Sequence, residues 1–477
     1  IINADQISYL KNEEKVIANG NVQLEDKNKN IIINTDQISY LKSKENIFAN
    51  GNVQLEDKNK DIIINTDQIS YLKNEEKVIA NGNVQLEDKN KDISINADQI
   101  SYLKNEEKVI ANGNVQLEDK NKNIIINTIK ITYLKNISKI YSEGKTEAYI
   151  GSKYKFYSKD VTFLKDEMKL YSSNKTIIND DNLSTYELGS FNYQIKEEFL
   201  KGTDITIVEN SSLPSGKSDK LYFSNGFFNL KNKNFKTGAT KIKLKKNLFE
   251  RPENDPRLYG VSSTKKNNIT SVKKAVFTSC KKTDSCPPWR LEASQIKHDK
   301  NKKQLIYDDA ILKVYDIPVF YFPKFFHPDP TVKRQSGFLQ PKLNNSNILG
   351  SSLSVPYFYA ISKNKDLTFS PVLFSDDVKM IQTEFRQKNE NSSIIADFGI
   401  TSGYKSSTTN QKKNINHFFA RLEKDLKLDN FINSDLNIFF ERINKDTYLK
   451  IFGDNLSESI IKPKNNDILN SGFDFFL

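Results

Sequence analysis

The sequence lacks the features that would indicate a membrane helix, an enzyme or a helical fold. No apolar run reaches the roughly 18 residues that a membrane-spanning helix needs. Only 3 His and 2 Cys occur, and the sequence contains neither a G-x-S-x-G nucleophile motif nor a glycine-rich phosphate loop. Helix-forming residues do not recur with a period of 3.6. We therefore predict a protein that is not an enzyme and has no cofactor and no metal site.

Charge and composition favour a β protein with a solvated surface. The 71 Lys and Arg against 60 Asp and Glu give a net charge of +11, spread through Asn- and Lys-rich turns. No compact basic block stands out, so we predict no nucleic-acid partner. The 30 Phe and 21 Tyr, together with many β-branched residues, favour an all-β chain. A length of 477 residues predicts two or three domains.

A 31-residue repeat occupies the N-terminal part of the chain. The segment IANGNVQLEDKNK begins at Ile17, Ile79 and Ile110, and the variant FANGNVQLEDKNK begins at Phe48. Apolar and polar residues alternate along each copy, as in a β-strand with one apolar face. A second run, IIINTDQISYL from Ile31, supplies the partner strand. Each copy is therefore a predicted antiparallel hairpin, bent at its glycine, and stacking the copies buries the apolar faces.

The apolar face of the stacked hairpins has two interpretations. It is either a core filled by the protein's own side chains or an open groove that solvates acyl chains, at about 0.8 kcal/mol per buried CH₂. Periodicity does not separate the two, because both need the same alternation. The residues that would line such a groove are Val16, Ala18, Val22, Leu24, Ile38, Tyr40, Val53, Leu55, Val84, Leu86, Val115 and Leu117.

Two acidic patterns resemble metal sites only superficially. An aspartate recurs once per copy, at Asp5, Asp36, Asp67 and Asp98. The glycine-rich nonapeptide of Ca²⁺-binding β-helices is lacking, so we interpret this column as solvated ends of the strand ladder. The HPDP segment at His327 is interpreted as a turn, because of its two prolines.

The repeat becomes irregular after about residue 128, although KFYSKDVTFLKDEMKLYSSN, from Lys155, still alternates as strand, turn and strand. From Glu253 onward the motifs ENDPRLYG, AVFTSC, PPWRLEASQIKHD, LIYDDAILKVYDIPVFYFPKFFHPDP, SGFLQP and VPYFYAISKNKDLTFSP follow in order. Together they resemble the LptD family of outer-membrane lipopolysaccharide-assembly proteins, also called organic solvent tolerance proteins. The GNVQLED repeats resemble the OstA/LptA-type unit at the N-terminus of that family.

This resemblance implies an all-β fold, an elongated periplasmic β-jelly roll of 31-residue hairpin repeats followed by the first strands of an antiparallel outer-membrane β-barrel. The implied domains are OstA/LptA-like repeats over 1–157, diverged jelly-roll rungs and the crossover to the barrel over 158–335, and barrel strands over 336–477. The implied location is the outer membrane, with the N-terminal domain in the periplasm.

The resemblance also implies a function and partners. Lipopolysaccharide would move along the apolar groove and enter the outer leaflet sideways, and on this ground we prefer the groove to a filled core. The implied partners are lipopolysaccharide, an LptE-type plug lipoprotein and an LptA-type periplasmic bridge protein.

Residues 336–477 also show the residue pattern of membrane-barrel strands. In SDLNIFFERI, Leu436, Ile438 and Phe440 alternate with a second set of residues that is mostly polar, as membrane strands of about 9–11 residues do. A soluble sandwich gives similar patterns, so alternation leaves both open. The segment has room for about 10 strands, against about 26 in the family barrel. We expect a truncated barrel that could not close, in a chain that opens on Ile1 as a mature form or a fragment.

Two prolines, Pro341 in GFLQPKL and Pro356 in SVPYFYA, lie in the expected first two barrel strands. Proline donates no ladder hydrogen bond, and an unmade backbone bond is costly in a bilayer, so such a strand junction is weak. Both positions match the family's pair of lateral-gate prolines; the alternative is a pair of loop prolines at strand boundaries. The prolines expected to shape the crossover are Pro318, Pro323, Pro328 and Pro330.

The two cysteines, Cys280 and Cys286, precede the PPW motif. An even number of cysteines in a periplasmic protein favours a disulfide, and the family uses disulfides to join jelly roll and barrel. Either these two pair locally, or their partners lie beyond Leu477. A zinc pair is not expected, since the nearest histidine is His298 and no second pair of ligands occurs.

Two other functions remain open. One is a repeat-built extracellular stalk or adhesin with no role in lipid transport, and the other is binding of acidic polymers through the lysine excess. The proline pair and the ordered motifs after Glu253 argue against a stalk, which needs neither. The even spacing of the lysines argues against the second.

Overall fold

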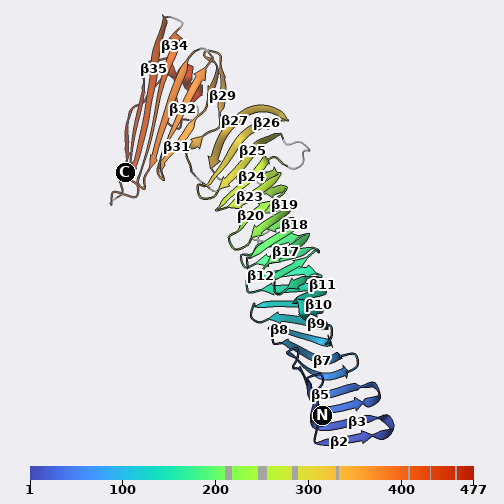
Figure 1. The fold of residues 1–477 in the computed structure, drawn as a ribbon. Helices are drawn as coiled ribbons and strands as arrows, with labels where there is room; N and C mark the ends of the chain where they lie inside the picture. The colour runs from blue at the N-terminus through green and yellow to red at the C-terminus, as the bar shows by residue number, and fades with distance from the viewer. Residues whose placement is uncertain are drawn as a thin grey trace. The chain divides into compact units, whose positions relative to one another are not determined.

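The structure is a computed structural model, and it describes residues 1–209, 218–244, 255–281, 288–328, 332, 334–375, 377–406, 409–429, 431–456 and 459–477. The chain forms two compact units, Ile1–Asn301 with Tyr307–Phe325, and Lys302–Ile306 with Phe326–Leu477. The predicted all-β fold is confirmed, and strands follow one another along the first unit (Figure 1). The segments expected over 1–157 and 158–335 thus lie mostly in one unit, which ends near residue 325. Within the described ranges, no helix has the length and apolarity that crossing a membrane requires.

Hydrogen bonds connect the strands β1–β27 into one sheet system. Those of the repeats and their first continuation are β1 (Ile2–Asn3), β2 (Gln6–Leu10), β3 (Lys15–Asp26), β4 (Ile31–Leu41), β5 (Asn46–Asp57), β6 (Ile62–Leu72), β7 (Lys77–Asp88), β8 (Ile93–Leu103), β9 (Lys108–Asp119), β10 (Ile124–Leu134) and β11 (Lys139–Ile150). Short 3₁₀ turns η1 (Lys11–Glu13), η2 (Lys42–Lys44) and η3 (Lys135–Ile137) join some of them.

The remaining strands of this system vary more in length. They are β12 (Tyr154–Lys159), β13 (Thr162–Leu164), β14 (Lys169–Ser172), β15 (Thr176–Asp180), β16 (Thr185–Leu188), β17 (Ser190–Gln194), β18 (Phe199–Val208), β19 (Lys220–Asn229), β20 (Asn234–Thr237), β21 (Thr240–Lys243), β22 (Arg257–Gly260), β23 (Ser262–Lys266), β24 (Ile269–Thr278), β25 (Trp289–Asp299), β26 (Gln304–Val314) and β27 (Ile317–Pro328).

Each repeat forms a long hairpin whose strands bend at a glycine. β3 pairs with β4 antiparallel, with a shift of register between Asn19 and Val22. Gly20 and Asn21 fill that shift with φ values of +76° and +44°, the left-handed conformations that a bulge at a corner requires. The same corner recurs at Gly51, Gly82, Gly113 and Gly144. The predicted hairpin with a bend at its glycine is therefore confirmed.

The corner divides every rung into two halves that enclose one apolar core. On β3, Ala18 lies before the corner and Val22 and Leu24 lie after it, and all three are buried in the same cluster. This cluster continues without interruption as far as Leu230. Stacking of the hairpins thus buries the face that a single hairpin exposes, as a solenoid requires.

After β11 each of the next three long strands is replaced by two separate strands, one on either side of the corner. β11, β12, β15, β16, β18, β17, β14 and β13 pair in this order, and β13 pairs again with β11, all antiparallel. Three successive rungs are therefore split at the corner, and the eight strands form a closed circuit of hydrogen bonds. Strands thus continue after residue 128, and their interpretation as diverged rungs of the repeat stays a prediction.

The second unit contains a ten-stranded antiparallel sheet. Its strands are β28 (Gly337–Phe338), β29 (Lys342–Ser346), β30 (Gly350–Ser354), β31 (Tyr357–Ser362), β32 (Lys365–Phe374), β33 (Lys379–Lys388), β34 (Ser392–Ser406), β35 (Thr409–Asp425), β36 (Asp435–Ile443) and β37 (Gly472–Phe476). Between β36 and β37 lie the short helix α1 (Tyr448–Phe452) and the 3₁₀ helix η5 (Gly453–Leu456).

Helix α1 packs on one face of this sheet. Tyr448 and Phe452 are buried in a cluster with Val372, Met380 and Phe419 of the strands. Tyr448 also contacts a buried histidine, since its hydroxyl lies 2.6 Å from Nδ1 of His417. His417 Nε2 lies 3.2 Å from Oδ1 of Asp397, so polar contacts and apolar packing together fix the helix on the sheet.

Candidate functional site

The residues predicted to line a lipid groove lie inside the first unit, where protein side chains surround them. Ten of the twelve, all except Val16 and Tyr40, are at most 5% exposed, and those two are half-buried. The ten buried residues belong to the single core described above and Tyr40 packs against it, whereas Val16 and the strand neighbours Gln23, Gln54 and Gln85 do not belong to it. The structure therefore places most of the predicted residues together on one interior face, and that interior is filled along the repeats.

Polar contacts join the two halves of the rungs on the side opposite the corner. One half ends in turns that we call the A turns (27–30, 58–61, 89–92, 120–123, 151–153 and 181–184), and the other ends in the B turns (73–76, 104–107, 135–138, 165–168, 195–198 and 230–233). Contacts run from the first five A turns, or from the aspartate just before each, to a B turn 45–47 residues later in the sequence. We call this row of contacts the seam.

Buried ion pairs form the inner layer of the seam. Asp57 is fully buried and accepts a hydrogen bond of 3.0 Å from the Tyr102 hydroxyl, and Lys104 Nζ lies 3.4 Å from the same carboxylate. One rung later Asp88 accepts from Tyr133 at 2.8 Å and from Lys135 at 2.5 Å. The two flanking rungs contribute the pairs Asp26–Lys73 and Asp119–Lys165.

A second, more exposed layer of ion pairs covers the first. It consists of Lys29–Glu76, Lys60–Glu107 and Lys91–Asp166. Because the two layers join the turns of opposite halves, they close the apolar interior on the side where a groove would open. An isolated buried carboxylate is costly, whereas one paired with a lysine and a tyrosine hydroxyl is compensated.

The last ion pair of the seam lies at Glu198. Lys153 and the Tyr154 hydroxyl donate to its carboxylate at 3.0 Å and 2.9 Å. Burial alone would raise the pKa of Glu198, but these two hydrogen bonds hold the pKa below its ordinary value. Glu198 is therefore a carboxylate that the fold keeps charged.

The aspartate column lies at the corners of the rungs and not at ladder ends. Asp67 Oδ2 would be 2.4 Å from a Cβ added to Gly82, and it accepts a hydrogen bond of 3.1 Å from Asn83. The same contacts recur for Asp5, Asp36 and Asp98. Our interpretation as ladder ends is wrong in position: the carboxylates hold the bulge together. Within the described residues, no group of three or more potential metal ligands is found.

Pro341 and Pro356 lie in one interrupted hairpin of the second unit. β28 pairs with β31, and β29 pairs with β30, so the chain segments 337–346 and 350–362 run side by side. Pro341 lies between β28 and β29, and Pro356 lies between β30 and β31. Between the two ladders, a hydrogen bond of 2.8 Å runs from the Leu339 amide to the Pro356 carbonyl. Both prolines thus lie at strand boundaries, at the same break.

A third proline lies beside this break and was not predicted to be part of the site. Pro371 lies inside β32, whose register with β30 and β31 places it beside the gap that contains Pro356. It therefore adds another missing amide donor next to the break. The signal was present in the sequence, since Pro341, Pro356 and Pro371 are spaced by 15 residues, but only the strand register shows that the spacing aligns them.

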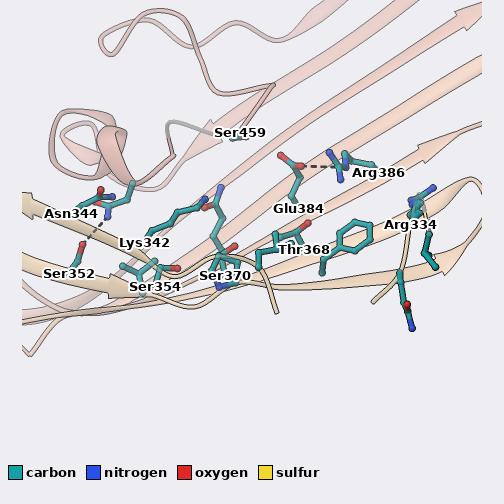
Figure 2. Close-up of a pocket in the computed structure, with 18 residues that line it drawn as sticks. Arg334, Lys342, Asn344, Ser352, Ser354, Thr368, Ser370, Glu384, Arg386 and Ser459 are labelled. Carbon is teal, nitrogen blue, oxygen red and sulfur yellow. Dashed lines mark hydrogen bonds and ion pairs between the residues drawn. The ribbon is translucent and has the colours of Figure 1, made fainter. Parts of the chain in front are cut away.

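A polar cavity of about 480 Å³ adjoins the break. Figure 2 shows Lys342, Ser354, Ser370 and Glu384, from four neighbouring strands, directed into one space. Arg386 lies 2.8 Å from Asp366 and 3.7 Å from Glu384, and Arg334 pairs with the same Asp366. Pro356 also lines the cavity. Around the cavity this face of the sheet is therefore polar and charged, whereas Val372, Met380 and Phe419 on the same face pack beneath α1.

The opposite face of the sheet is apolar and exposed. Phe398 on β34 pairs in register with Phe418 on β35, and Ile438 on β36 pairs with Phe473 on β37. All four are at least 40% exposed, and the same face carries Phe369, Leu373, Ile381, Ile400, Phe440 and Phe475. Apolar outside and polar inside is the pattern of membrane-barrel strands, and it reverses the arrangement of a soluble sandwich.

The remaining predicted residues are placed as follows. Cys280 is half-buried, with its Sγ 3.7 Å from the Trp289 carbonyl, whereas Cys286 and Pro330 lie outside the described residues. The disulfide therefore stays a prediction. Pro318, Pro323 and Pro328 all belong to β27, at the end of the first sheet system.

Comparison with known proteins finds several relatives that carry one name. The chain is 28% identical to "LPS-assembly protein LptD" of Legionella pneumophila (strain Paris) over 203 residues, 39% of this chain and 23% of that protein. It is 33% identical to the LptD of Polaromonas sp. (strain JS666) over 116 residues, 24% of this chain and 14% of that protein. It is 40% identical to the LptD of Shewanella sp. (strain ANA-3) over 106 residues, 21% of this chain and 14% of that protein.

The predicted resemblance to LptD is thereby confirmed. No family model matches the chain. The chain spans less than a quarter of the length of the relatives it matches.

Proposed function

We propose, from its resemblance to LPS-assembly protein LptD, that this chain takes part in lipopolysaccharide assembly in the outer membrane and is not an enzyme. In this proposal the first unit lies in the periplasm and carries lipopolysaccharide, and the second unit lies in the outer membrane and releases it sideways. An LptA-type bridge protein would deliver the lipid, and an LptE-type lipoprotein would occupy the barrel.

The observation that supports this proposal most directly is the reversed polarity of the second sheet. Its exposed face carries Phe398, Phe418, Ile438 and Phe473, while Arg386 and Asp366 pair on the other face. A repeat-built stalk or adhesin would keep both solvent-facing surfaces polar, so the exposed apolar face disfavours that second candidate. Contact with lipid acyl chains would cover this face.

Lipid passage through the first unit would require its interior to open. Buried side chains fill that interior, and the seam joins its two halves through the Asp57–Lys104 and Asp88–Lys135 pairs. An entering acyl chain would separate the halves at the seam, replacing contacts among Val, Ile and Leu side chains by contacts with its own CH₂ groups. Exchange of one apolar contact for another costs little, so breaking the seam would set most of the free-energy cost.

Lateral release would take place at the hairpin break. Pro341, Pro356 and Pro371 leave three amide donors absent where the adjoining segments meet. A junction with fewer ladder bonds opens at a lower free-energy cost, which supports this location for the gate.

Photo-crosslinking in cells tests the transport proposal. A photoreactive amino acid at Val22, Val53 or Leu86, which point into the core, should capture lipopolysaccharide. The adjacent positions Gln23, Gln54 and Gln85, which lie outside it, serve as matched controls and should not. Capture that is absent at the interior positions, or equal at both sets, would refute passage through the first unit.

A further inference from the structure

The seam ends at an apolar cavity with a cationic rim. The next A turn, 181–184, and the next B turn, 230–233, do not form an ion pair in the described part of the chain; instead a cavity of about 370 Å³ lies between the two halves. Ile207, Leu221, Phe228 and Phe235 line its apolar part. Its rim therefore lies where the row of seam ion pairs ends.

Three lysines converge on this cavity from successive rungs. Lys233 comes from the B turn after β19, Lys265 from β23, and Lys300 from the turn after β25. Along the seam, by contrast, each lysine of the inner layer has its own carboxylate, as in Lys104–Asp57 and Lys135–Asp88.

Negative charge at the cavity does not balance these lysines. Glu209 is the one carboxylate among the lining residues that the structure describes. Asp180 does not line the cavity and accepts a hydrogen bond of 3.3 Å from the Tyr186 hydroxyl. Burial, and then the charge of Lys300, lower the pKa of Lys265, with Lys233 adding to the effect and Glu209 opposing it. The fold thus holds like charges close together beside an apolar space, an arrangement that an anionic ligand would stabilise.

We propose that this cavity binds an amphiphile with an anionic phosphate head, the head at Lys233, Lys265 and Lys300 and the apolar chain against Phe228, Phe235 and Leu221. The proposal deepens the transport function above and rests on it for the identity of the natural ligand, a phosphate-bearing lipid. A neutral amphiphile would leave the lysine charges uncompensated, and a free phosphate would leave the apolar wall exposed to water.

Photo-labelling of the full chain tests the site locally, which matters because an amphiphile would also find exposed apolar side chains on the second unit. The probe is dodecyl phosphate with a diazirine in its chain, and the neutral comparison is a dodecyl glucoside with the same diazirine. Dodecyl phosphate should label peptides that contain Phe228 or Phe235, and the glucoside should label them at least about tenfold less at equal concentration, as expected when charge-assisted hydrogen bonds are lost.

Variants separate the lysines of the cavity from lysines in general. Lys265→Gln combined with Lys300→Gln should raise the half-saturating concentration of dodecyl phosphate at least about tenfold, since each removes a charge-assisted hydrogen bond. Lys236→Gln removes a charge from β20 that does not line the cavity and is the matched control. Lys265→Arg should retain labelling, because the charge stays.

Three outcomes would overturn the proposal: no labelling near Phe228, equal labelling by the glucoside, or displacement of the probe by inorganic phosphate at similar concentration. The first outcome would mean that the cavity binds no amphiphile. The second would mean that it binds apolar chains without regard to the head group, and the third that it binds phosphate without the chain. If the interior positions capture no lipopolysaccharide but dodecyl phosphate still labels the cavity, the transport function is refuted and the binding site is retained.

Discussion

At the scale of single residues, the corner of each rung depends on a glycine and an aspartate that exclude a larger side chain. Gly82 has a φ of +80°, and an added Cβ would meet Asp67 Oδ2 at 2.4 Å. Asp67 cannot move away without loss of its hydrogen bond to Asn83. In the fifth rung Ile129 takes the place of the aspartate, and a Cβ added to Gly144 would lie 3.0 Å from its Cδ1. The corner thus requires a residue without Cβ even in a rung that has no aspartate.

Gly82→Ala should therefore cost more than backbone strain alone. Left-handed backbone costs a residue with a Cβ about 1–2 kcal/mol, and displacing Asp67 would add the loss of a charge-assisted bond, for a total of about 3 kcal/mol. Gly151→Ala is the matched control, because its φ is +57° and nothing lies within 4 Å of the added Cβ. Hydrogen exchange of the substituted rung measures both free energies, and equal effects would contradict the role of Asp67.

At the scale of strands and turns, the hairpins could be predicted from the sequence but the seam could not. Alternation defines strands such as 31–41, and the glycine marks the bend, because both depend on neighbours within one copy. The pairing of Asp57 with Lys104 depends on how far one half of the stack is offset from the other. No local pattern encodes that offset, although the spacing of 47 residues recurs in the repeats once it is known.

The same limit explains the filled interior and the missed proline. Whether Val53 faces a groove or a core depends on the distance between two sheets. The alternation of apolar and polar residues does not encode that distance. Likewise, Pro371 is visible in the sequence, but its place beside Pro356 follows only from the register of β30, β31 and β32.

Breaking one inner pair of the seam should destabilise its rung strongly. Asp88→Asn leaves the Lys135 ammonium, whose side chain is 10% exposed, without its carboxylate, and removal of one partner of a buried pair costs about 3 kcal/mol. The local opening free energy of β7 and β10, measured by hydrogen exchange, should fall by that amount.

The matched control is an exposed pair in the same stack. Glu106→Gln removes the partner of Lys108 at 3.6 Å, where the glutamate side chain is 57% exposed, so the change should stay within about 0.5 kcal/mol. Comparable losses for the two variants would mean that the seam acts only as a surface ion pair and does not hold the two halves together.

At the scale of the whole molecule, the same alternation of apolar and polar residues serves two opposite environments. In the first unit the apolar residues of alternating strands, such as Val53 and Leu55, are buried between the two halves of the rungs. In the second unit the corresponding set, such as Ile438 and Phe440, is exposed, and the polar set lines a cavity. The sequence pattern specifies strands in both units, and the partner on the apolar face, protein or lipid, distinguishes them.

The change of environment matters most at the hairpin break of the second unit. Water cannot satisfy free backbone groups inside a bilayer, so unpaired groups at the break would be costly there. Changing Pro341, Pro356 and Pro371 together to Ala would supply three amide donors where a bond from Leu339 to Pro356 now crosses. Each hydrogen bond made would stabilise the closed junction by about 0.5–1.5 kcal/mol. Hydrogen exchange over 337–345 and 350–358 should slow at least about twofold, and lipopolysaccharide at the cell surface should decrease. Pro463→Ala, the same change outside the strands, should alter neither, and a triple variant with unchanged exchange would exclude a gate at this break.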